Sequence, residues 1–400
     1  MKGFLPLAIP VAAGLGLGLF APALAVQMQP LAQAFIHLLG WLTYPLIFCM
    51  LVSSASTLGR HRELGRIGAL AFAYFALLSL LSMLSGLAAG WALEPGVGAV
   101  LAAGPLPATA PPPAAPASML GWLDRLPSLK ANNLLLLAAA LPIGLLLGRF
   151  PDARVLALAE RCRLRLFGAI KLLLMLAPLA AFGAMAAAVG RHGLAPLLPL
   201  LKFIAAINLA SALFVLVVLG GAAWFAGMSL LRFIAYIRAE LYLVFFTSSS
   251  LAGLVPLSEK LEGLGCPRAV TDVVLPFSYS LNLAGTYLYI AMGLVFLTQA
   301  AQVRLGWHEL AWMLGVALIS SKGAVGVAGS GVATLAATVA LLHVVPPETM
   351  AILFAIDRTM KCRLLTNVIG HGVACVVVAA SDKRLNRQAL ARALSATRPV

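Results

Sequence analysis

Long apolar runs separated by short basic linkers make up most of the first half of the chain. Each run is close to the ~20 apolar residues that an α-helix needs to cross a bilayer. The pattern predicts six membrane-spanning helices, over residues 4–25, 30–57, 67–93, 132–149, 166–190 and 197–227. Residues 1–25 also resemble a secretory signal that ends in a cleavage site. The length of this run and the spans that follow it favour a first transmembrane helix.

Polar residues interrupt the apolar runs of the second half, at Thr247-Ser-Ser-Ser250, at 278–286 and in the glycine-rich stretch 320–331. The first and third interruptions predict helical hairpins over 236–270 and 310–345, and the second predicts a broken span over 272–300. Backbone leaves the helical form at membrane depth only where protein or a water-filled cavity surrounds it. Interrupted spans of this kind are typical of the binding site of a transporter.

The last apolar run, residues 351–380, carries polar and charged side chains in its first two-thirds: Asp357, Arg358, Lys361, Arg363, Asn367 and His371. A charge at mid-bilayer costs roughly 2.5–3.5 kcal/mol on insertion scales, so these residues are functional candidates. Thr359 begins a stripe that continues every fourth residue through Arg363, Asn367 and His371, the spacing of one helix face. The stripe contains no anion, which predicts one wall of an anion site. The alternative is that the charges pair with neighbours, and Asp357 stands one turn before Lys361.

The residue types in these segments suit a carboxylate ligand. The planar fork of Arg363 can hold a carboxylate through two parallel hydrogen bonds. The serines 248–250 offer hydroxyls and, where a half-helix begins, free N–H groups; alternatively they only allow close helix packing. Asn282, Thr286 and Asn367 offer neutral oxygens for a hard cation or a substrate. The 320–331 glycines allow exposed carbonyls, which are ready cation ligands, and a mobile gate.

Composition and charge narrow the class of protein. The chain is 62% hydrophobic and 10% charged, whereas soluble domains carry roughly 25% charged residues, so it is an integral membrane protein. The net charge of +15 comes from basic clusters between spans, which predicts cytoplasmic linkers and termini and excludes a nucleic-acid partner. The Pro- and Ala-rich residues 94–131 predict an external loop. The five cysteines show no metal spacing. A serine hydrolase is excluded because no Gly-x-Ser-x-Gly elbow is present.

Four motifs together resemble one family. Thr247-Ser-Ser-Ser250, Asn282-Leu-Ala-Gly-Thr286, Ser321 to Gly331 and Arg363-Leu-Leu-Thr-Asn367 are similar to motifs of the dicarboxylate/amino acid:cation symporters, most closely the bacterial C4-dicarboxylate transporters. The resemblance implies an all-α, glutamate-transporter-like fold with eight transmembrane helices and two re-entrant hairpins, in a homotrimer within the lipid of the inner membrane. It also implies a transport region that slides like an elevator against a scaffold.

The resemblance also divides the chain. Residues 1–235 become mainly scaffold, with 67–93 in the transport part, residues 236–382 the core transport region, and 383–400 a cytoplasmic tail. Together with Thr286, the implied substrate contacts are Ser248, Ser249, Ser250, Val327, Gly331, Arg363 and Asn367. The implied sodium contacts are Asn282 and Asn367, with backbone carbonyls around Ser280, Ser321, Lys322 and Ala324. Sodium ions, protons or both become the coupling ions, and no other cofactor is expected.

The chain departs from the family pattern at the cation positions. Ala284 stands where a cation-binding carboxylate is expected, and His371 stands where relatives carry Asp or Asn. Histidine ionises near neutral pH, so His371 is a possible proton site. The aspartate that holds a substrate amino group has no clear equivalent near 361–362, which favours succinate, fumarate or malate over an amino acid. The lost carboxylates also allow a second interpretation: an uncoupled anion carrier, a channel or a binder that does not transport.

Overall fold

The computed structural model describes residues 5–31, 65–99, 174–194, 197–248, 250–303, 306–321, 330–342 and 356–395, together with isolated residues and short pieces between these ranges. The described residues form helices and turns, and none of them lies in a β-strand. The predicted spans 30–57 and 132–149 and the predicted external loop 94–131 fall largely outside these ranges. The predicted all-helical architecture is confirmed for the part of the chain that is described.

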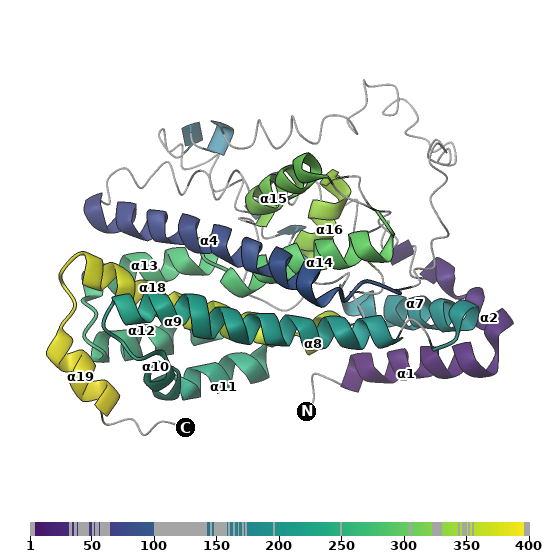
Figure 1. The fold of residues 1–400 in the computed structure, drawn as a ribbon, viewed down its shortest axis with the longest axis horizontal. Coiled ribbons are helices and arrows are strands. Elements are labelled where there is room, and N and C mark those ends of the chain that lie inside the picture. Colours follow the sequence, from purple (N-terminus) through teal and green to yellow (C-terminus); the bar gives the residue numbers. More distant parts are fainter. Residues whose placement is uncertain are drawn as a thin grey trace.

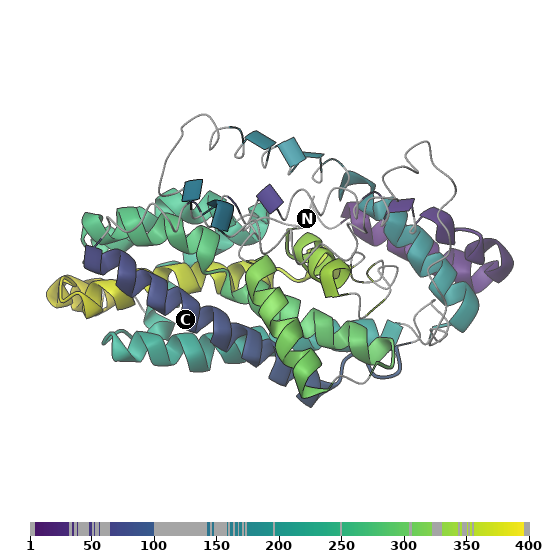
Figure 2. The ribbon, with the colours of Figure 1, turned by 90° about the horizontal axis from the view of Figure 1, so that it is seen from above.

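Three helices from the first half gather at one end of the molecule: α1 (Leu5–Phe20), α2 (Pro22–Val26) and α7 (Ala177–His192) (Figures 1 and 2). Pro22 starts a second helix after Ala21, so the predicted single span 4–25 is broken. A side chain at Gly14 or Gly18 would collide with α7. These two glycines therefore let α1 lie directly on α7.

Two long elements extend along the body of the molecule (Figure 1). One is α4 (Gly65–Leu93), as predicted for 67–93. The other comprises α8 (Leu197–Phe214), the π-helical turn η4 (Val215–Leu219) and α9 (Gly220–Phe225), which continue one another where the sequence predicts a single span.

The first predicted hairpin, 236–270, contains α11 (Arg238–Thr247), the 3₁₀ turn η5 (Ser250–Gly253) and α12 (Leu254–Gly263), and the short helix α10 (Leu230–Tyr236) leads into it. Its two arms lie antiparallel. At the base, the Tyr236 hydroxyl donates to the carbonyl of Lys260 at 3.2 Å. Near the tip, Gly253 approaches Val244 so closely that an added Cβ would lie 3.0 Å from its Cγ2. The α-helix of the first arm ends at Thr247, directly before the serines, as the sequence predicts.

The broken span consists of α13 (Arg268–Leu281) and α14 (Ala284–Ala300). Asn282 (φ −125°, ψ 60°) and Leu283 (φ −95°, ψ 61°) leave the helical conformation between them. The next apolar run forms α15 (Trp307–Ser321) and α16 (Ser330–Leu342), which pack on each other. The residues between these two helices, 322–329, lie outside the described part.

The last span is not one helix. The 3₁₀ turn η7 (Asp357–Thr359) precedes α18 (Cys362–Ser381), and Met360 between them has φ −90° and ψ 57°. The prediction of a continuous helix over 351–380 was therefore wrong at this point, and Thr359 does not share the α18 face of Arg363, Asn367 and His371. A helix that the sequence analysis missed, α19 (Arg387–Ser395), follows in the tail.

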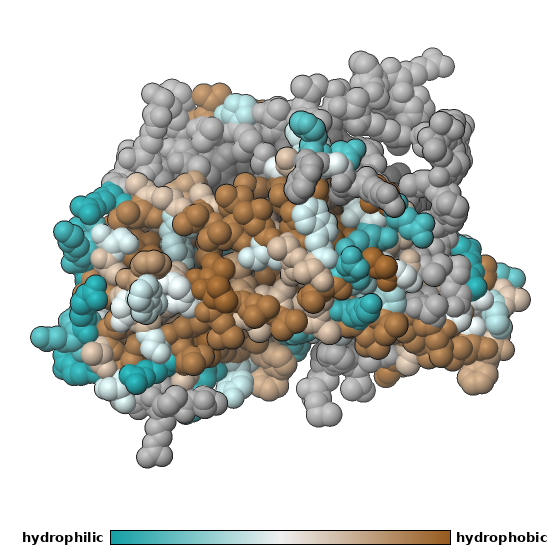
Figure 3. Space-filling view, in the orientation of Figure 1, coloured by the Kyte–Doolittle hydropathy of each residue, from teal (hydrophilic) through white to brown (hydrophobic). Residues whose placement is uncertain are grey.

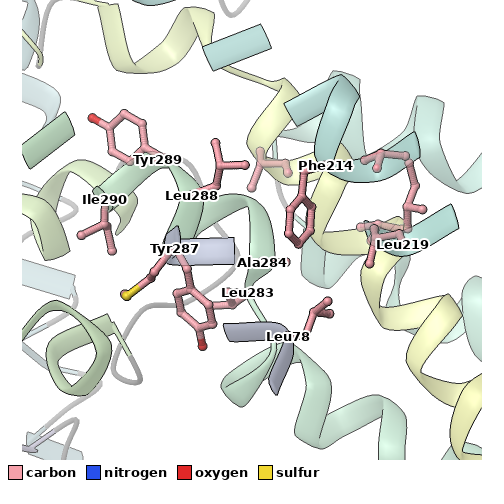
Figure 4. Packing of buried hydrophobic residues seen from close by; sticks show 14 of the residues in the cluster. Leu78, Phe214, Leu219, Leu283, Ala284, Tyr287, Leu288, Tyr289 and Ile290 are labelled. Atoms are coloured by element: carbon pink, nitrogen blue, oxygen red, sulfur yellow. The ribbon is translucent and has the colours of Figure 1, made fainter. Parts of the chain in front are cut away.

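The core is centred on α14, whose residues are almost all buried. Figure 4 shows side chains from α4 (Leu78) and from α8 and η4 (Phe214, Leu219) around the first turn of α14. Side chains at Gly86 or Gly90 of α4 would collide with α14, so the two backbones lie in close contact. Gln299 fastens the far ends of the two helices, since its side chain accepts from Gly96 N at 2.9 Å and donates to Gly90 O at 3.0 Å.

The surface fits a lipid environment. Within the described part of the chain, four helical segments are long and apolar enough to cross a membrane: Arg66–Leu93, Leu197–Phe225, the broken span Arg268–Ala300 and Cys362–Ser381. Leucines of α4 and α8 stay exposed and form part of the apolar area in Figure 3. Hydrophilic residues gather at the end where α19 and the start of α4 lie. There Asp382, itself buried, pairs with Arg66 at 3.4 Å and Arg384 at 2.9 Å.

Candidate functional site

Arg363 lies in the first turn of α18 with only 2% of its side chain exposed. Its Nη1 donates to Asp357 Oδ1 at 3.1 Å, and the Asp357 side chain is 4% exposed. The guanidinium carbon lies 5.0 Å from the centre of the Tyr289 ring, a cation–π arrangement. The Arg363 Nε has no hydrogen-bond partner among the described residues. A buried guanidinium that keeps a free donor can still bind an anion.

Gly331, at the start of α16, makes room for this guanidinium. A Cβ on Gly331 would collide with Nη1 and would lie 2.6 Å from the Arg363 Cζ. The predicted contact between residue 331 and the substrate is thus accompanied by a contact with the arginine itself. A larger residue at this position would therefore displace the guanidinium from where it lies.

Asp357 and Lys361 do not pair with each other, although their spacing suits an ion pair on a helix. The backbone between them is not α-helical, so the one-turn rule does not apply. Asp357 pairs with Arg363 instead. Lys361 donates to the carbonyl of Phe245 at 2.9 Å, in the last turn of α11. A cation at a helix C-terminus is favourable, so Lys361 stabilises the first arm of the hairpin.

The side chain of Asn367 forms hydrogen bonds with the first turn of α14. Its Oδ1 accepts from the backbone N–H groups of Gly285 at 2.8 Å and Thr286 at 3.3 Å. Its Nδ2 donates to the Thr286 Oγ1 at 3.1 Å. Asn367 therefore caps a helix more than eighty residues away in the sequence. Both predicted ligand residues are brought together, and much of their polar capacity is used on each other.

A second polar group lies further along α18. The His371 ring is fully buried and stacks on Tyr279 of α13, with ring centres 4.0 Å apart and planes 31° apart. Asn282, at the helix break, donates from Nδ2 to Gly370 O at 3.5 Å. Neither nitrogen of His371, nor the Asn282 Oδ1, nor the Tyr279 hydroxyl has a hydrogen-bond partner among the described residues. Buried polar atoms of this kind usually serve a ligand or an ordered water.

Ala284 is the first residue of α14 and is completely buried. Its carbonyl accepts a hydrogen bond from the Ser82 hydroxyl of α4. Its side chain adds a methyl group to the core. The residues present offer a cation the Asn282 Oδ1 as a hard ligand at this break.

The hairpin tip carries backbone strain. Ser248, which ends α11, has φ 54° and ψ 33°, a left-handed conformation that side chains other than glycine and asparagine rarely adopt. Such strain concentrates at functional sites. Ser250 begins η5 and is fully buried, and η5 packs against α18. The hairpin tip and the Arg363 helix are therefore neighbours.

Part of the predicted site falls outside the described residues: Ser249, Lys322, Ala324 and Val327, together with the side chains of Ser280 and Ser321. Sequence reasoning missed Tyr289 and Tyr279. Both are aromatic residues within apolar runs and look like ordinary core residues. The sequence therefore carries no signal that could have identified them as part of the site.

A helical hairpin, a broken helix and a buried arginine meet inside an apolar helical body with membrane-length helices. This arrangement defines a membrane transport protein, since interrupted helices around buried charges form the binding sites of such proteins. The chain belongs to the sodium:dicarboxylate symporter family, whose family model matches residues 4–381.

Curated relatives cover nearly the whole chain. The C4-dicarboxylate transport protein of Burkholderia multivorans (strain ATCC 17616 / 249) is 39% identical over 398 residues, which cover 96% of this chain and 93% of that protein. The C4-dicarboxylate transport protein of Burkholderia lata is 40% identical over 396 residues, with 96% and 92% covered. That of Burkholderia pseudomallei (strain 668) is 40% identical over 403 residues, with 96% and 93% covered. The predicted family membership is confirmed, and the protein is a transport protein, not an enzyme.

Proposed function

We propose that this protein imports small C4-dicarboxylates such as succinate, fumarate and malate across the bacterial inner membrane by cation symport. The observation that carries the proposal is the Arg363 guanidinium, which is buried, paired on one side with Asp357, and free at Nε among the described residues. A carboxylate is the ligand that suits such a donor. The names of the relatives support the substrate class.

The coupling ions belong to the region around Asn282 and His371. Sodium would use the Asn282 Oδ1 and backbone carbonyls around Ser280 and Ser321, since hard cations take oxygen ligands. His371 is the candidate proton site. Among the described residues, the ionisable groups close to this region include the Tyr279 phenol of α13 and the Cys375 thiol of α18. Ala284 supplies no charge, so we expect fewer sodium ions per cycle than in a relative that has a carboxylate there.

The mechanism we propose is alternating access of the elevator type in a homotrimer, with 236–382 as the moving core and α4 travelling with it. The close contact between α4 and α14 supports joint movement of these two helices. Both termini are assigned to the cytoplasm. The exposed basic residues at the α19 end support this orientation, because cytoplasmic segments carry an excess of Lys and Arg.

The second candidate is a relative that binds or conducts dicarboxylates without cation coupling. It is favoured by Ala284, whose buried methyl group stands at the start of α14. The two candidates differ in whether substrate can be concentrated against a gradient.

Uptake of labelled succinate into proteoliposomes tests these possibilities. An inward sodium gradient, an inward proton gradient, both or neither is imposed, with Arg363→Ala as the negative control. Accumulation above the external concentration supports symport, and equilibration alone supports the uncoupled carrier. The absence of succinate entry and binding in correctly folded protein would refute the dicarboxylate assignment.

A further inference from the structure

Tyr279 lies between the proposed coupling-ion region at His371 and the hairpin turn that begins at Ser250, which is proposed to contact the substrate. It lies on α13, one turn before the break at Asn282, and is 4% exposed. Its ring stacks on the buried His371 ring of α18. This contact joins the helix that carries Arg363 to the first half of the broken span.

The other end of the Tyr279 side chain reaches the hairpin. Its hydroxyl lies 3.8 Å from the position that a Cβ on Gly253 would take. Gly253 is the last residue of η5, the short turn that begins at Ser250. One rigid aromatic side chain thus stacks on the proposed coupling-ion residue and, at its hydroxyl end, faces the last residue of the proposed substrate-binding turn.

The chemistry of the contact favours transmission of movement over simple polar satisfaction. The Tyr279 hydroxyl has no hydrogen-bond partner among the described residues, so no hydrogen bond there fixes the position of the side chain. The ring itself stacks on His371 of α18, and its hydroxyl end faces η5. Packed interiors change by discrete shifts and not by smooth deformation, so a shift of the His371 ring displaces the Tyr279 ring and then η5.

We propose that Tyr279 is a positioning residue that couples occupancy of the cation or proton site at Asn282 and His371 to the position of the Ser250 turn. The inference rests on the proposed function and deepens it. Coupling between two ligands is a free energy shared by both sites, so it is measured as the factor by which one ligand changes the affinity of the other.

The test measures succinate binding to purified protein in nanodiscs by isothermal titration calorimetry. Each variant is titrated without and with a saturating amount of the coupling cation, and at two pH values for the proton arm. The ratio of the two succinate Kd values is the coupling factor. Tyr279→Leu removes the ring stack, and its coupling factor should fall by about fivefold or more, toward one. The cation-free succinate Kd should change much less.

Tyr279→Phe keeps the ring stack but removes the hydroxyl that faces Gly253, so its coupling factor should lie between those of the wild type and Tyr279→Leu. One substitution serves as a control. Tyr74→Phe removes a buried hydroxyl of α4 that also has no partner among the described residues, and it should leave both Kd values unchanged. Gly253→Ala approaches the contact from the hairpin side, because the added methyl group would press on Val244 and lie next to the Tyr279 hydroxyl. It should lower the coupling factor without a change at Tyr279, and it keeps the test valid if Tyr279→Leu fails to fold.

Several results would overturn the inference. One is an unchanged coupling factor in folded Tyr279→Leu or Gly253→Ala. Another is an equal loss of succinate affinity with and without cation, which indicates a purely structural role. Wild-type protein that binds succinate with no cation or pH effect also overturns it, while the dicarboxylate assignment survives. Wild-type protein that binds no succinate overturns the proposed function and the inference together.

Discussion

Replacing Arg363 by alanine should abolish dicarboxylate binding. The guanidinium is nearly fully buried, so its loss is not compensated by water. Removing one partner of a buried charged contact typically costs ~2–5 kcal/mol. Since 1.36 kcal/mol corresponds to a factor of ten, the succinate Kd should rise by a factor of roughly 30 or more.

The same substitution leaves the Asp357 carboxylate buried without its partner. Stranding one half of a buried ion pair costs ~3–5 kcal/mol of folding stability, which would confuse a loss of binding with a loss of fold. The Arg363→Ala/Asp357→Asn double variant removes both charges. It should have a higher Tm than Arg363→Ala alone and should still fail to bind succinate.

Calorimetric titration of purified protein gives the Kd, a thermal melt gives the Tm, and proteoliposome uptake gives transport. Arg363→Lys should restore binding only weakly, because an ammonium group cannot present two parallel donors. A folded double variant that binds succinate with wild-type affinity would refute the assignment of Arg363 to the substrate.

Four further predictions use the same assays. Gly331→Ala should reduce uptake strongly in protein that still inserts, since its methyl group would displace the Arg363 guanidinium; unchanged uptake would show that the guanidinium moves freely. Ala284→Asp should steepen the sodium dependence of uptake, and His371→Asn should flatten a rise in uptake at acidic pH. A wild type with a steep sodium requirement and no pH response contradicts both expectations. Deletion of 105–118 should leave uptake nearly unchanged, because this Pro- and Ala-rich segment has little to bury; collapse of uptake with normal insertion would contradict this.

The sequence alone predicted the structure correctly at several places where a polar or charged residue interrupts an apolar run. Thr247-Ser-Ser-Ser250 in an apolar run predicted the end of α11, and the polar stretch around Asn282 predicted the break before α14. A charged residue in an apolar span similarly indicated that Arg363 is buried against protein. A short stretch of sequence is enough for these predictions, because each depends on the free-energy cost of exposing backbone polar groups or a charged side chain to lipid.

The sequence was insufficient wherever partners are distant or the backbone departs from the helix. The helical spacing of Asp357 and Lys361 predicted an ion pair between them. Because the backbone turns at Met360, Asp357 instead accepts a hydrogen bond from Arg363, and Lys361 donates to a backbone carbonyl of α11. The capping of α14 by Asn367 requires two segments that only the tertiary fold brings together. The periodicity of polar residues within one segment of the chain carries no information about either contact.

The glycine contact between α4 and α14 has a consequence for how the protein is made. Gly96 and Gln299, which fasten the two helices, are 203 residues apart. At 5–20 residues per second, α4 emerges from the ribosome roughly 10–40 s before its partner. During that interval its glycine face has no α14 to cover it. We therefore expect that Gly86→Leu, whose side chain would collide with the Leu288 carbonyl of α14, reduces the yield of assembled protein during biosynthesis.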